Sequence, residues 1–160
     1  MTRYLAPAGV ALVVATGWIL VLPPAPVAQP IAFSHAKHAP MACAVCHRGV
    51  ETAARAGLPA ASLCAKCHAS IPGGATGTAG GDVGQSGRIA WVRVTRVPDH
   101  TMFSHRRHVA LGRLDCASCH ADIGLRASPP VRQPVRLDMD ACLSCHQREG
   151  ASEDCAACHR

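Results

Sequence analysis

The sequence predicts a small, mostly irregular fold with short α-helices, organised around covalently bound groups and preceded by one N-terminal transmembrane helix. The 160 residues include only two Trp, one Tyr and two Phe, and no long periodic apolar stretch follows the N-terminus. Such a chain cannot bury much side-chain core. All ten cysteines instead fall into five Cys-x-x-Cys-His motifs. The motifs are Cys43–Cys46–His47, Cys64–Cys67–His68, Cys116–Cys119–His120, Cys142–Cys145–His146 and Cys155–Cys158–His159.

This motif is the attachment signature of c-type haem. Two sulfurs three residues apart on a turn face one side, where each can form a thioether to a porphyrin vinyl group. The next residue then brings its imidazole under the iron as the proximal ligand. Zinc sites and disulfide frameworks also use paired cysteines, but neither needs a His directly after the second Cys every time. The sequence therefore predicts five haem c groups, and folding should depend on their attachment.

The five histidines outside the motifs match five distal positions in number. Four of them lie in two similar segments, residues 33–38 and 103–108, each reading Phe-Ser-His-x-x-His. Two His three apart lie on one helical face, so one segment can reach two haems. We therefore expect bis-His ligation throughout, with the histidine outside the two segments as the assignment with the least support. The distal candidates are His35, His38, His105, His108 and, outside the segments, His100.

Three methionines lie near haem motifs and compete for any distal position that a histidine does not take. A Met is more often a packing residue than a ligand. These three are Met41, Met102 and Met139.

The N-terminal segment predicts a membrane anchor. Residues 5–22 form an uncharged run of 18 residues that ends at Pro23 and Pro24. That length lies at the lower edge for a spanning helix and above a usual signal-peptide core. Arg3 lies in the short segment before this run, and its positive charge predicts that the N-terminus stays in the cytoplasm. The haem domain would then be periplasmic and anchored to the cytoplasmic membrane. Cleavage after Ala28 is the alternative, although Pro26 is not the small residue that such a site prefers.

The organisation after the anchor (1–25) is repeat-like but uneven. The predicted haem domain covers 26–160, with two motifs in 26–72 and three in 99–160. The segment 73–98 combines a Gly-rich loop with an extended stretch near 89–94. The last two motifs are so close in sequence that their haems must be near neighbours.

The basic charge does not indicate nucleic-acid binding. The chain is formally +6 with a pI near 9.0. Each oxidised bis-His haem with two ionised propionates contributes −1, so five haems bring the total charge to about +1. Reduction of each iron removes one more positive charge, so the fully reduced protein is at about −4. Much of the Arg content is then expected to pair with propionates. No interleaving of basic and aromatic residues supports a nucleic-acid surface.

The order of motifs resembles the class III (cytochrome c3/c7-like) multihaem cytochromes. More narrowly, it is similar to the membrane-anchored pentahaem subunit of alternative complex III over nearly all of residues 30–160. The specific parts are the two Phe-Ser-His-x-x-His segments, Trp-Val-Arg-Val…Pro-Asp at 91–99 and Leu-Asp-Met-Asp-Ala-Cys-Leu-Ser-Cys-His at 137–146. This chain has Thr95 where that pattern usually has a His, so either His100 takes that role or one haem is ligated differently.

The resemblance implies electron transfer within a membrane quinol-oxidising complex. Its partners would be an iron–sulfur/molybdopterin-like subunit, an integral quinol-binding subunit and other cytochromes. A multihaem enzyme acting on nitrogen or sulfur compounds would need an open distal site, and ten His for ten axial positions leave none, so no catalytic residue is assigned. A quinol dehydrogenase subunit is a further alternative, and so is a soluble periplasmic shuttle, which would require cleavage of the N-terminal segment.

Overall fold

The computed structural model describes residues 25–68 and 88–159. The predicted anchor at 5–22 and the Gly-rich loop at 73–87 lie outside these residues. Within them, no helix is both long and apolar enough to cross a membrane. The helical elements are η2 (Ala36–His38), α2 (Cys43–Cys46), α3 (Ala61–Cys64), η3 (Arg106–Leu111), α4 (Ala117–His120), η4 (Ile123–Leu125), α5 (Met139–Glu149) and α6 (Cys155–Cys158).

Every Cys-x-x-Cys-His motif lies on a helical turn, as the spacing predicts. In four motifs the histidine N–H donates to the carbonyl of the first cysteine over 2.8–3.0 Å, which closes one turn. The fourth motif lies inside α5, the longest helix of the described residues. The turn places both sulfurs of each motif on one side. The prediction of a small, mostly irregular fold with short helices is thus confirmed for the described part of the chain.

Aspartates begin the last three of these helical turns. The carboxylate of Asp115 accepts from Ala117 N–H at 2.9 Å, and that of Asp154 accepts from Ala156 N–H at 3.1 Å. Asp138 caps α5 in the same way, and Gly150 ends that helix in the left-handed region with φ 62°. These caps satisfy amide groups that so short a helix cannot pair internally.

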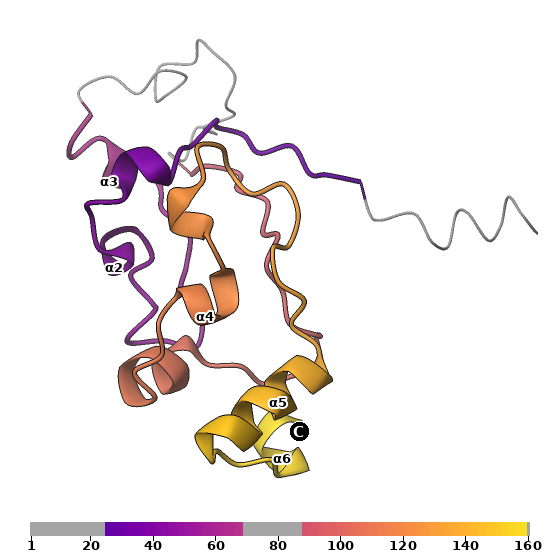
Figure 1. Cartoon of the computed structure of the whole chain (residues 1–160). Helices are drawn as coiled ribbons and strands as arrows, with labels where there is room; N and C mark the ends of the chain where they lie inside the picture. The colour runs from indigo at the N-terminus through magenta and orange to yellow at the C-terminus, as the bar shows by residue number, and fades with distance from the viewer. Residues whose placement is uncertain (1–24, 69–87, 160) are drawn as a thin grey trace, which may run out of the picture.

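Extended segments are joined by glutamine side chains where a sheet would have a backbone ladder. The Gln29 amide bonds to both backbone groups of Val92 and to the Pro130 carbonyl, at 2.8–3.1 Å. Gln133 accepts from Arg96 N–H at 3.1 Å. The segments near 90–98 and 129–137 accordingly run side by side (Figure 1). An isolated antiparallel bridge pairs Thr101 with His159.

The side-chain core is very small. Of the described apolar residues, only Ala61 and Ile89 are buried, with 4% and 9% of their surface exposed. Large apolar side chains remain outside, including Leu111 and Leu125 at 64% and 77% exposed. The polypeptide alone therefore supplies little of the apolar burial that a folded domain needs.

Candidate haem-binding sites

The two Phe-Ser-His-x-x-His segments fold alike although one forms a 3₁₀ turn and the other a π-type turn. In each, the first histidine meets the phenylalanine ring edge-on, with centroids 4.9 Å apart and an interplanar angle of 89°. The second histidine stacks on the same phenylalanine, at 4.6 Å for His38 on Phe33 and 4.5 Å for His108 on Phe103. Each phenylalanine therefore fixes the orientation of two imidazoles.

The serine of each segment holds the turn in place. The hydroxyl of Ser34 accepts from Lys37 N–H, and its carbonyl accepts from Nδ1 of His38 at 2.8 Å. Ser104 makes the equivalent bonds, with its carbonyl 2.8 Å from Nδ1 of His108. The spacing of the histidines does not predict this role of serine, although the Ser is repeated in both segments.

Three distal candidates lie opposite three motif histidines, with nearly the same distance between the ring centroids in each pair. Ring centroids are 6.1 Å apart for His38 and His68 and 6.3 Å for His105 and His120. Two axial imidazoles with metal–nitrogen bonds of about 2.0 Å have centroids roughly 6.4 Å apart. These separations therefore fit a metal between the rings.

The same relation holds between the second segment and the fourth motif. The ring centroids of His108 and His146 are 6.2 Å apart. The second segment thus directs His105, at the N-cap of η3, to the third motif and His108, within η3, to the fourth. This is the arrangement that the three-residue spacing predicts.

His100, the candidate with the least support from sequence, lies against the fifth motif. Its ring stacks on that of His159 with centroids 5.2 Å apart. The pair would have to open by roughly 1 Å to hold a metal as the other pairs would. The backbone keeps His100 near this motif, because Thr101 bridges to His159 and Met102 N–H donates to the Cys158 carbonyl at 2.8 Å.

His35 completes the set beside the first motif. Burial lowers the pKa of His35, and the nearby charges of His47 and His38 lower it further. The imidazole is half-buried, and its Nδ1 atom has no hydrogen-bond partner.

Backbone carbonyls fix the tautomer of most of these imidazoles. A carbonyl can only accept, so Nδ1 carries the proton and Nε2 keeps the lone pair that can bind a metal. These hydrogen bonds to carbonyls cannot be predicted from the sequence, because every residue has a carbonyl. Besides the bonds to the carbonyls of Ser34 and Ser104, four more histidines have Nδ1 beside a backbone carbonyl at 2.5–3.3 Å. They are His47 with Gly57, His105 with Ala54, His146 with Ser152 and His159 with His100.

The first motif lies between the second and the third. Burial raises the pKa of the Cys46 thiol, and the charges of Cys64 and Cys67 raise it further. The pKa of Cys116 is also raised by burial and then by the charge of Cys43. These thiols of different motifs are therefore close neighbours.

The fourth motif continues this succession towards the C-terminus. Burial raises the pKa of Cys119, and the charge of Cys145 raises it further. The pKa of Cys142 is raised by burial and then by the charges of Cys158 and Cys119. The last two motifs are thus neighbours, as their sequence spacing predicts.

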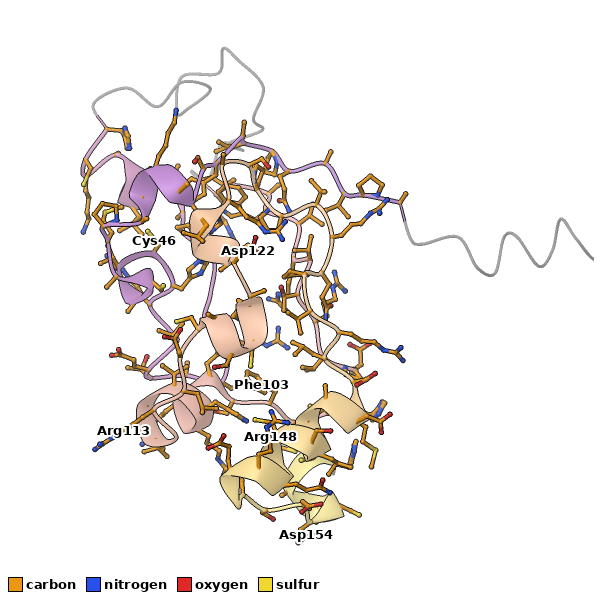
Figure 2. The ribbon with its side chains drawn as sticks, viewed as in Figure 1. Cys46, Phe103, Arg113, Asp122, Arg148 and Asp154 are labelled. Atoms are coloured by element: carbon orange, nitrogen blue, oxygen red, sulfur yellow. The ribbon has the colours of Figure 1, made fainter. Side chains whose placement is uncertain are left out.

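The five motifs form one succession along the molecule, in the order second, first, third, fourth, fifth. In Figure 1, α3 and α2 lie at one end, α4 lies in the middle, and α5 and α6 lie at the other end. Figure 2 shows Cys46 towards the first end, Asp154 at the opposite end and Phe103 between them.

The surroundings of the motifs fit an apolar group with carboxylates. A narrow cleft between Phe103 and the third motif is lined by His105, Cys116, Cys119 and His120. Beside Cys46, a cavity of about 530 Å³ is lined by apolar residues and by three cations that can pair with carboxylates. The cations are Arg48, Arg55 and Lys66.

The competing methionine ligands and all of the cysteines lie within the described residues. Met41, Met102 and Met139 are 40%, 54% and 60% exposed. All ten cysteines lie within the described residues, and all are free of disulfide bonds. Over residues 25–68 and 88–159, no group of three or more His, Cys, Asp or Glu is arranged around a common metal position.

Comparison with known families divides along the same two halves of the chain. Residues 21–80 match the class III cytochrome c family, and residues 101–160 match the family of cytochrome c7 and related cytochromes c. Among curated proteins, no relative matches the chain. The two family matches support a multihaem cytochrome of c3/c7 type, with covalently bound haem c, that transfers electrons.

Proposed function

We propose that this multihaem cytochrome of c3/c7 type carries five haems and relays electrons from a membrane quinol-oxidising complex to a periplasmic acceptor. The pairing of histidines is the observation that carries the proposal. Each motif histidine has a second histidine beside it, and three pairs are separated by 6.1–6.3 Å. Such pairs would occupy both axial positions, which favours electron transfer over substrate chemistry.

The chain's own residues would bind and tune the haem groups. Each cysteine pair would form two thioethers, and each histidine pair would supply two axial nitrogens. Haem c, when bound, would supply a one-electron Fe(III)/Fe(II) couple. The carbonyls on Nδ1 hold the imidazoles in the ligating tautomer, and Arg48, Arg55 and Lys66 are positioned to pair with carboxylates.

The haem count is the first test. The intact mass of the mature holoprotein should show five haem increments, because each cysteine pair has its own adjacent histidine and no cysteine is left over. The Cys155→Ala/Cys158→Ala variant should then carry four. Four or fewer haems in fully matured wild-type protein would refute the pentahaem proposal.

The membrane assignment rests on the sequence of residues 5–22 and needs its own test. We expect the mature chain to retain these residues and to fractionate with the membrane. After mild detergent extraction it should co-purify with an integral quinol-binding subunit and an iron–sulfur protein. N-terminal sequencing decides between anchor and signal. A mature chain that begins near Gln29 and purifies alone would instead favour a soluble shuttle.

A further inference from the structure

The fourth motif differs from the first in the hydrogen bonds of its imidazoles. Both histidines of the fourth site donate Nδ1–H to carbonyls: the motif histidine His146 to Ser152, and the distal candidate His108 to Ser104. An imidazole that donates in this way is a more basic ligand. A more basic ligand stabilises the ferric form and makes the iron harder to reduce.

The first motif has only one such bond. His47 donates to the Gly57 carbonyl at 2.9 Å, but Nδ1 of His35 is buried and has no partner. His105, the equivalent residue of the second segment, has the same edge-on contact with its phenylalanine and donates to Ala54 at 3.0 Å. The same local fold thus has an acceptor in one copy and lacks it in the other.

The missing acceptor has an identifiable cause. In the second segment, Arg106 N–H donates to Ala53, and both the N–H and Nδ1 of His105 donate to the carbonyl of Ala54, the next residue. In the first segment, Ala36 N–H donates to Arg126 in the corresponding way. The chain then enters a bend before Pro129 and Pro130, and His35 makes no bond to the carbonyl that follows Arg126.

The charges near the two motifs favour the same difference in reduction potential as the hydrogen bonds do. The cavity beside Cys46 has three cations, Arg48, Arg55 and Lys66, which oppose the positive charge of ferric iron. The helices α5 and α6 and the turn between them carry mostly carboxylates, which favour it. These are Asp140, Glu149, Glu153 and Asp154, against Arg148. Asp138, before α5, is instead paired with Arg136 at 2.6 Å.

We propose that the haem held by His108 and His146 has a more negative reduction potential than the haem held by His35 and His47. Electrons on this chain then pass spontaneously from the fourth motif towards the first. The inference rests on the ligation proposed above and adds a direction to it. We expect at least a tenfold difference in the ferric-to-ferrous ratio at a common potential, or about 59 mV for one electron.

The test is a redox titration of the full wild-type holoprotein followed by EPR. His35→Ala and His108→Ala each remove one distal ligand, so the low-spin signal lost in each variant identifies that haem. His105→Ala is the matched control, because it removes the distal ligand that has its acceptor. The potentials themselves are read from the unaltered protein. If an alanine variant does not fold, the methionine variant assigns the same haem through its near-infrared charge-transfer band.

Each outcome decides the proposal. The signal assigned to His108 should titrate at least 59 mV below the signal assigned to His35. A smaller difference or the reverse order overturns the inference but leaves the proposed ligation intact. If both variants fold and retain every low-spin signal, the ligation itself is wrong, and the inference is overturned with it.

Discussion

Without haem attachment, the body of this chain should not fold. Within the described residues only two apolar side chains are buried, Ala61 and Ile89, and none is fully enclosed. The free energy of binding structural groups is then folding free energy. The free energy lost when all five haems are absent should therefore exceed the roughly 5–15 kcal/mol by which a typical domain is stable. Chain produced in a host that lacks c-type haem maturation should show an unordered far-UV CD spectrum and no cooperative transition in urea.

Two double variants with the same haem count make this prediction more specific. Cys116→Ala/Cys119→Ala removes the third site, which has neighbours on both sides, and Cys155→Ala/Cys158→Ala removes the fifth, at one end. Both should carry four haems, and the first should have the lower urea midpoint. A haem-free chain with a cooperative transition would contradict the prediction, because side-chain packing would then suffice.

The parts of the site that the sequence predicted are those encoded locally. A Cys-x-x-Cys-His motif needs one helical turn, and the structure has a turn at each motif. The two Phe-Ser-His-x-x-His segments are also local, so their histidines point to two different motifs as the spacing predicts. Short helices and a thin core follow from the scarcity of aromatic residues and of periodic apolar stretches.

The pairing of histidines was beyond sequence reasoning because it depends on distant contacts. Nothing in the spacing shows that His38 lies opposite His68, or that His100 lies against His159. The latter arrangement depends on one backbone bridge, from Thr101 to the last motif. The unpaired Nδ1 atom of His35 is likewise a product of tertiary structure, since His35 and His105 hold the same place in the shared Phe-Ser-His-x-x-His pattern.

Removal of the third site should divide the remaining haems into two groups that no longer exchange electrons rapidly. The third motif lies between the first motif on one side and the fourth motif on the other. Cys116 lies near Cys43 of the first motif, and Cys119 lies near Cys145 of the fourth. Burial lowers the pKa of His120, and the charges of His105 and then of His47 lower it further, so the first motif is close on this side too.

A photoreductant placed at one end can measure this division. A label on a cysteine that replaces the exposed Glu149 would inject electrons beside α5 and α6. In the wild-type background the signal of the first two haems should follow in a fast phase. In Cys116→Ala/Cys119→Ala that phase should be lost while local reduction persists.

The control for this experiment is Cys155→Ala/Cys158→Ala, which also has four haems but keeps the succession from the fourth motif to the second. It should retain the fast phase, so loss of a haem alone does not explain the effect. If the variant without the third site still equilibrates in one fast phase, the electrons bypass α4. The linear order of motifs would then not be the order of transfer, and direct exchange between the two halves would have to replace it.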